Sequence, residues 1–192
     1  MIAVLPGTTI QTGLDKQDIS KQIFDNIFAA GGLVLSQVSQ LTNLESYVIQ
    51  NWVKRGFLSS PVNKRYSKRQ FCRIVIINML KDTLRLDKIT GMLSYINGVL
   101  SDESDDAIDD NQLYNYYVNL IVQLNKRGHE VSYIDNNKLC ESVINMLHDY
   151  KEPFTGAKKR LQKVLVIMVN AHLSALLSKK TELLIGELDL KI

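Results

Sequence analysis

The sequence predicts a mainly α-helical fold with one short β hairpin. Only three prolines and ten glycines occur in 192 residues, so helix-breaking residues are rare. Apolar residues recur at spacings of three and four along most of the chain, whereas the alternation typical of strands is scarce. Apolar residues make up 45% of the sequence, enough to bury a core, which argues against a wholly disordered chain.

The predicted helical segments follow one another with recognisable starts and ends. Asp18 can cap the first segment and Gly31 can end it, because these residue types favour those positions. Asn43 lies in a short turn after the second segment and can cap the third, which Gly56 ends. Ser67 can cap the fourth. The segments comprise residues 18–30, 33–41, 45–55, 68–81, 86–100, 110–127, 137–150 and 155–178.

Three stretches depart from the pattern of an amphipathic helix. Residues 1–14 show no period and are predicted to be an irregular lead-in. Residues 59–66 are predicted to form an extended hairpin, or wing, since Pro61 disfavours a helix there. The last segment is apolar on nearly all sides between Leu161 and Leu177. Such a helix is buried inside a bundle or shared between subunits.

Positive charge is concentrated in one part of the chain. The net charge is only +3, yet residues 46–81 carry eight basic side chains and no acidic one. Such a cluster attracts polyanions, because each Lys or Arg that neutralises a phosphate releases a counterion. The alternative is a solvated basic face on one helix, but these cations are spread over two predicted helices and a turn. The eight residues are Lys54, Arg55, Lys64, Arg65, Lys68, Arg69, Arg73 and Lys81.

A change of composition marks a predicted domain boundary. Residues 101–110 contain six acidic side chains and no basic one, which is typical of a solvated linker that leads into a helix. The run lacks the glycine and glutamate spacing of a calcium loop, and docking on the basic segment as a DNA mimic is a further alternative. The predicted division is an N-terminal domain over residues 1–100, this acidic linker, and a C-terminal helical domain over 111–192.

The order helix, turn, helix, wing, helix resembles the N-terminal domain of MerR-type regulators, a winged helix-turn-helix. The matching motifs are Leu35-Ser-Gln-Val-Ser-Gln-Leu-Thr, Trp52-Val-Lys-Arg-Gly-Phe-Leu, Arg65-Tyr-Ser and Leu86-Asp-Lys-Ile-Thr-Gly-Met-Leu, within roughly residues 20–120. Asn51-Trp-Val-Lys, Pro61-Val-Asn-Lys-Arg-Tyr-Ser and Ile77-Asn-Met-Leu-Lys also resemble a Gram-positive bacterial family, DUF1836, classed as a domain of unknown function. The resemblance implies a MerR-like winged helix-turn-helix that binds DNA, followed by a C-terminal helical bundle.

Two departures from the MerR pattern limit what the resemblance implies. Gln50 stands where many MerR relatives have an Arg in the recognition helix. Three predicted helices follow the wing domain, whereas those relatives end in one long antiparallel coiled-coil helix. Only the DNA-binding scaffold is therefore carried over to this chain.

The predicted DNA-binding residues lie on the recognition helix and around the wing. A helix can present polar side chains to base edges in the major groove while flanking cations hold phosphates. Gln50 can pair bidentately with adenine, and Lys64 is placed for a phosphate or the minor groove. Tyr47 and Tyr66 either contact DNA or pack inward, and Trp52 is predicted to be a core residue. The predicted set is Ser46, Tyr47, Gln50, Lys54, Arg55, Lys64, Arg65, Tyr66, Lys68 and Arg69.

Several other classes of site find no support in the sequence. No nucleophile elbow, Walker loop or paired-carboxylate pattern occurs, so no enzymatic activity is predicted. The three histidines have no ligand partner at a recognised spacing, and we expect no metal and no cofactor. Cys72 and Cys140 are predicted to be unpaired thiols in a reducing compartment. A redox or metal sensor at Cys72 is the alternative to a structural thiol.

The expected protein is a cytoplasmic regulator of transcription. The longest uncharged apolar run, Val164 to Val169, is far too short to span a membrane, and the N-terminus lacks the pattern of a signal peptide. We expect binding to double-stranded DNA as a homodimer, with the C-terminal helices serving dimerisation or an unidentified small-molecule effector. The alternative to the dimer is a monomer whose last helix is the core element. The alternative function is a helical interaction module that binds another protein or RNA without specific DNA binding.

Overall fold

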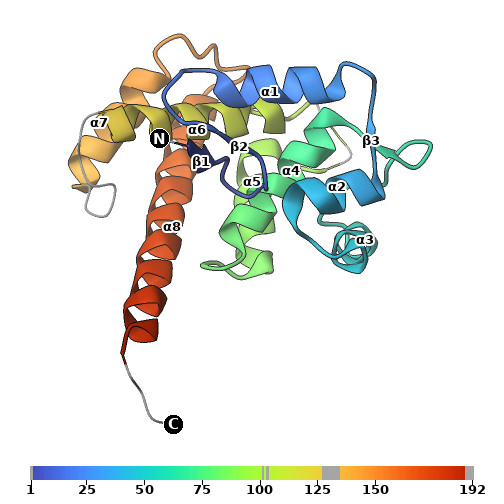
Figure 1. Ribbon diagram of the computed structural model, residues 1–192. Coiled ribbons are helices and arrows are strands. Elements are labelled where there is room, and N and C mark those ends of the chain that lie inside the picture. Colours follow the sequence, from blue (N-terminus) through green and yellow to red (C-terminus); the bar gives the residue numbers. More distant parts are fainter. Residues whose placement is uncertain (1, 101, 103, 127–134, 189–192) are drawn as a thin grey trace.

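The computed structural model describes residues 2–100, 102, 104–126 and 135–188, which form a mainly helical protein (Figure 1). This confirms the mainly α prediction. The helices are α1 (Ile19–Phe28), α2 (Leu35–Thr42), α3 (Ser46–Lys54), α4 (Lys68–Leu80), α5 (Leu86–Asn97), α6 (Asp110–Lys126), α7 (Asn136–Met146) and α8 (Ala157–Gly186). The strands are β1 (Ile2–Val4), β2 (Gln11–Gly13), β3 (Leu33–Val34) and β4 (Arg65–Tyr66), which form two antiparallel pairs.

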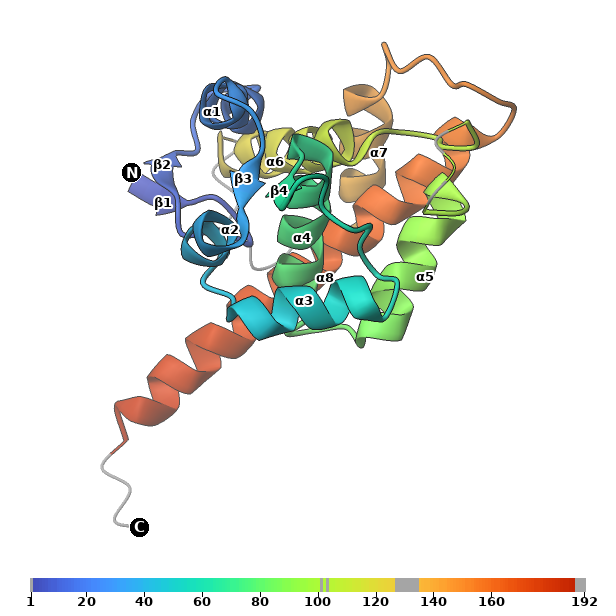
Figure 2. The same cartoon turned by 90° about the vertical axis from the view of Figure 1, so that its right-hand side faces the viewer.

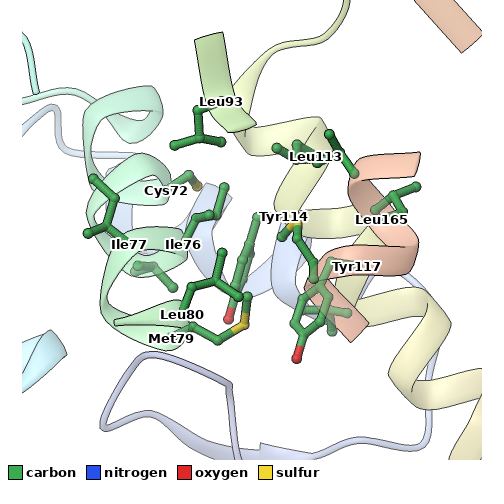
Figure 3. Packing of buried hydrophobic residues seen from close by; sticks show 14 of the residues in the cluster. Cys72, Ile76, Ile77, Met79, Leu80, Leu93, Leu113, Tyr114, Tyr117 and Leu165 are labelled. Atoms are coloured by element: carbon green, nitrogen blue, oxygen red, sulfur yellow. The ribbon is translucent and has the colours of Figure 1, made fainter. Parts of the chain in front are cut away.

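Helices α4 and α6 form the centre of the molecule. They pack against each other, α1 packs on α6, and α8 contacts both α4 and α6. Figure 3 shows Tyr114 and Tyr117 of α6 between Leu80 of α4 and Leu165 of α8. Phe24 of α1 stacks on Tyr114, with their ring centroids 5.4 Å apart. Such contacts between rings add to the stabilisation that burial itself provides.

The hydrophobic core is one cluster that extends along most of the chain. Its buried members run from Leu5 to Leu173, and Ala107 and Ile108 from the acidic run belong to it. Tyr150 donates a hydrogen bond from its hydroxyl to the carbonyl oxygen of Ala107. Residues 101 and 103 of the predicted linker lie outside the described residues. The division of the chain into two domains stays a prediction.

The N-terminal residues form a β hairpin, so the predicted irregular lead-in was wrong. Ala3 of β1 pairs with Thr12 of β2, and the intervening loop packs against α4. Gly7 has φ +76°, and a Cβ atom there would lie 2.4 Å from the carbonyl oxygen of Val75. Only glycine fits this approach without a shift, since it has no side chain and tolerates positive φ. The hairpin is held by contacts to distant helices, which local periodicity does not reveal.

Two of the predicted helix caps differ in the structure, whereas the third is confirmed. Asp18 precedes α1 in a left-handed conformation and its carboxylate makes no capping hydrogen bond. It accepts hydrogen bonds from Asn115 and Asn119 of α6 instead, and these lower its pKa. The residue that precedes α3 is Glu45 rather than Asn43. Ser67 caps α4 as predicted, and it does so in a capping box with Gln70.

Helix α8 is partly core and partly exposed. Its first half buries residues such as Leu161 and Met168, whereas its second half projects away from the body of the molecule (Figures 1 and 2). Leu177, Leu184 and other apolar side chains there are exposed. By length and composition α8 is able to span a membrane, which the short uncharged runs in the sequence did not suggest. Core helices of soluble proteins can have the same length and composition, and 39% of the most apolar stretch of α8 is buried here.

Candidate nucleic-acid interface

Helices α2 and α3 form a compact pair joined by a short turn. Asn43 has φ 54°, a left-handed conformation that asparagine tolerates and that reverses the chain after α2. The hydroxyl oxygens of Ser39 and Ser46 lie 2.9 Å apart, in hydrogen-bonding contact between the two helices. The predicted site residue Ser46 is therefore half-buried and bonded within the pair rather than free on the outer face.

The two faces of α3 separate core residues from exposed ones, as the period of a helix requires. Ile49 and Trp52 point into the core, which confirms the prediction for Trp52. Tyr47 is 69% exposed, and Gln50 and Lys54 are also exposed. Tyr47, Gln50 and Lys54 are spaced by three and four residues, so they share one outward face. This face is polar, aromatic and basic.

The predicted wing is a tight hairpin between Val62 and Arg65. Asn63 and Lys64 have φ 50° and 60°, and the amide of Arg65 donates to the carbonyl oxygen of Val62 at 2.9 Å. Two central residues with positive φ are characteristic of a type I′ turn, which matches the twist of antiparallel strands. Lys64 is therefore exposed at the tip of the hairpin. In Figure 1 this hairpin is the teal-green loop beside the β3 label, and it extends away from the helices.

Strand β4 ties the wing back to the start of α2. Val34 pairs with Arg65, and Leu33 pairs with Tyr66. The Arg65 guanidinium donates to the carbonyl oxygen of Gly32 at 2.8 Å. Tyr66 is only 3% exposed, and burial raises the pKa of its hydroxyl. Its side chain belongs to the core, so we leave it out of the interface that we propose below.

Three basic side chains of the segment 46–81 meet acidic partners from elsewhere in the chain. Lys68 pairs with Asp25 of α1. The Arg69 guanidinium pairs with Asp106, and its Nε lies 3.9 Å from Asp109. The Arg73 guanidinium pairs with Asp110 at 3.2 Å. The acidic run thus neutralises part of α4, an arrangement that the sequence offered only as one alternative.

Lys81 pairs with the adjacent Asp82, and the other four cations of the segment remain outside ion pairs in the described part of the chain. Lys54, Arg55, Lys64 and Arg65 are exposed, and none of them forms an ion pair with another described residue. The Arg55 guanidinium lies over the ring of Phe57, 4.6 Å from its centroid, which orients it without removing its charge. The structure therefore places the unneutralised charge at the end of α3 and in the wing, the two places where the sequence predicted DNA contacts.

The cysteines and possible metal ligands offer little chemistry in the described part of the chain. Cys72 is fully buried on α4, and burial raises the pKa of its thiol well above the usual value. A buried thiol of this kind is a poor nucleophile, because the thiolate is the reactive form. Cys140 is a free, exposed cysteine. No group of three His, Cys, Asp or Glu side chains in the described residues is arranged to hold a metal ion. His129 lies outside those residues.

Comparison with known proteins places the chain in a family. It is similar to the "Uncharacterized protein YkrK" of Bacillus subtilis (strain 168), with 36% identity over 78 residues. That match covers 38% of this chain and 34% of the relative, so the chain spans about a third of the length of the curated relative that it matches. No solved structure matches it. Residues 19–117, more than half of the chain, match the family described as "Domain of unknown function (DUF1836)", and the chain therefore belongs to that family, as its motifs predicted.

Proposed function

We propose that this protein is a cytoplasmic, DNA-binding transcriptional regulator that uses a MerR-like winged helix-turn-helix. The proposed domain consists of β3, α2, α3 and β4. One observation carries the proposal: the pairing of β3 with β4 returns the wing beside the start of α2, while the outer face of α3 and the tip of the wing stay exposed. Two exposed basic elements on one scaffold are what a duplex requires, a helix for the groove and a hairpin for the backbone.

In the proposed complex, α3 enters the major groove. Gln50 reads a base edge, because its amide can donate and accept toward adenine at the same time. Tyr47 and Lys54 flank it on the same face. Lys64 and Arg65 neutralise phosphates beside the groove. The remaining predicted contacts contribute less, since Ser46, Lys68 and Arg69 are engaged with Ser39, Asp25 and Asp106.

The proposed regulator acts as a homodimer through the exposed half of α8. Leu177 and Leu184 are separated by seven residues, two turns of a helix, and Leu188 lies just beyond the end of α8. These side chains are between 43% and 59% exposed, a stripe that water solvates poorly. A second copy of the same helix would cover the stripe. The two protomers of this dimer could each contact one half-site on the same duplex.

The test is fluorescence anisotropy of a random-sequence duplex with the parent protein at several salt concentrations. We expect the logarithm of the binding constant to fall linearly with the logarithm of the salt concentration, because binding releases counterions. Lys54→Ala and Lys64→Ala should each reduce the slope by roughly one unit. The matched control is Lys180→Ala on α8, which should keep the parent slope. Equal binding by Lys64→Ala, Lys54→Ala and the parent would rule out the proposed interface.

A second candidate function is a helical interaction module that binds another protein. One observation favours it. Helices α7 and α8 line a cavity of about 500 Å³ that is open to solvent, and its exposed apolar lining includes Ile144 and Ile167. Exposed apolar surface suits a protein partner better than a nucleic acid. Retention on immobilised heparin separates the two candidates, because elution at low salt concentration favours the interaction module.

A further inference from the structure

A second cavity, distant in sequence from the wing, lies where five parts of the chain meet. Its volume is about 570 Å³, within the range of small-molecule sites. Leu5 and neighbouring residues of the N-terminal hairpin form one wall, and Met79 at the end of α4 contributes to another. Ile121 of α6 and His172 of α8 also line it.

The hairpin wall of this cavity is fixed by contacts to α6 and α4, and α4 in turn bonds to the end of α2. The hydroxyl of Tyr114 donates to the carbonyl oxygen of Pro6 at 2.7 Å. The side-chain amide of Asn78 donates to the carbonyl oxygens of Gly7 and Thr42, at 2.9 and 2.8 Å. A wall held by hydrogen bonds in this way exists before any ligand arrives, which reduces the entropy lost on binding.

Several polar groups at the cavity have no partner in the described chain. His172, Asn125 and Lys179 make no hydrogen bond or ion pair with other described residues. The His172 and Tyr117 rings form a T-shaped contact, with centroids 5.9 Å apart, and burial together with Lys179 lowers the pKa of His172 to about 4. The imidazole is therefore neutral at pH 7 and still has one N–H to donate. All three groups are able to donate hydrogen bonds.

The charges around the cavity favour an anion. Lys81 and Asp82 line it as an ion pair of 3.1 Å, so their charges offset each other. Lys179 is then the uncompensated charge among the described lining residues. It follows His172 by seven residues, which places both on one face of α8. Side chains on a helix lean toward its N-terminus, so Lys179 leans toward His172.

The apolar walls limit the class of anion. Val4 and Leu176 offer exposed aliphatic surface, and the described lining contains no Phe, Tyr or Trp on which a nucleobase could stack. We propose that this cavity binds a small aliphatic carboxylic acid, whose carboxylate accepts hydrogen bonds from Lys179, His172 and Asn125. Its hydrocarbon chain lies against Val4 and Leu176.

The cavity lies next to the turn that leads into α3, so a bound acid can influence the DNA-binding face. Thr42 and Asn43, from the end of α2 and the turn before α3, line it together with α8. An acid bound in the cavity therefore contacts the turn that orients α3, and it also contacts α8, the helix that the proposed dimer uses. This regulatory role rests on the proposed function, whereas the binding site does not, because it can be tested without DNA.

The experiment titrates the full chain with straight-chain acids from acetate to decanoate and with the alcohol of equal length in each case. The readout is the proton NMR spectrum of the histidine rings at pH 7, and the spectrum of His172→Phe assigns the His172 signal among the three histidines. We expect a saturable shift of that signal with a medium-chain acid and a much weaker effect of the matching alcohol. Lys179→Gln should raise the dissociation constant about tenfold or more, since a hydrogen bond to a charged group is lost.

The control variant is Lys180→Gln, the neighbouring lysine on α8, which does not line the cavity and should bind the acid like the parent. Three outcomes would overturn the site: no acid in the series shifts the His172 signal, the alcohol binds as tightly as the acid, or Lys180→Gln weakens binding as much as Lys179→Gln. Anisotropy with the random duplex, with and without the acid, is a separate measurement. Acid binding without any DNA binding would leave the site intact and refute the proposed function.

Discussion

Arg73 on α4 and Asp110 at the start of α6 form an ion pair in the interior of the protein. The guanidinium Nη1 lies 3.2 Å from the carboxylate Oδ2, and the two side chains are 6% and 1% exposed. The Nε of Arg73 also donates to the carbonyl oxygen of Phe57 at 3.0 Å. One side chain thus joins α4, the segment after α3 and the end of the acidic run. Burial raises the pKa of Asp110 even with this partner.

Removing one member of this pair should be costly. Asp110→Ala leaves the Arg73 charge buried without its partner, and we expect a loss of about 3–5 kcal/mol in the free energy of unfolding. Urea denaturation followed by circular dichroism measures the change. Arg85→Ala is the control, because the pair of Arg85 with Asp87 is exposed, and it should cost about 0.5 kcal/mol or less. Similar losses for both variants would contradict a structural role for the interior pair.

The neutral state of His172 predicts how stability depends on pH. Its pKa is about 4 in the folded protein and near 6.5 in the unfolded chain, so the unfolded state binds more protons between these values. Stability should therefore be complete above pH 6.5 and should fall as the pH decreases toward 4, by at most about 3 kcal/mol from this group. His172→Phe removes this part of the pH dependence while keeping an aromatic ring beside Tyr117. Denaturation at pH 7 and pH 4.5 measures the difference.

The control for the pH experiment is His148→Phe. His148 is exposed just beyond α7, where its ring contacts Asp149 and the carbonyl oxygen of Asn145, and its replacement should keep the parent's loss of stability in acid. A parent-like acid profile for His172→Phe would show that other groups cause the loss.

Local features of the fold could be predicted from the sequence, and features that depend on distant contacts could not. Ser67 and Gln70 are three residues apart, so their capping box is visible in the sequence. The N-terminal hairpin depends on contacts such as that of Pro6 with Tyr114, more than a hundred residues away. The Asp18 carboxylate likewise bonds to α6 rather than to its own helix.

The same distinction applies to the candidate site. The spacing of Tyr47, Gln50 and Lys54 places them on one face of α3, which helical periodicity predicts. The neutralisation of Arg69 by Asp106 follows from how α4 and the acidic run pack, and no local pattern fixes that packing. A basic run in a sequence therefore overstates the charge that the folded surface offers to a polyanion.

The exposed half of α8 predicts the behaviour of the proposed dimer. Leu184→Glu places a charge in the middle of the apolar stripe, and burying it against a second copy would cost too much for the dimer to persist. Light scattering at micromolar concentration should give about twice 21.8 kDa for the parent and 21.8 kDa for the variant. Ser178→Glu, on another face of α8, should leave the parent mass unchanged. A parent mass of 21.8 kDa across the dilution range would end the dimer proposal.

Base reading and phosphate binding should separate at Gln50 and Lys64. A preferred duplex is first selected from random sequences with the parent protein. Gln50→Ala should then lose about 1–3 kcal/mol of discrimination at one base pair, because a bidentate contact to adenine disappears, with little change in the salt slope. Lys64→Ala should instead weaken binding to preferred and random duplexes alike. Both side chains are exposed, so circular dichroism should show that the variants fold like the parent. If Gln50→Ala weakens every duplex equally, the residue contacts the backbone and α3 does not read sequence through it.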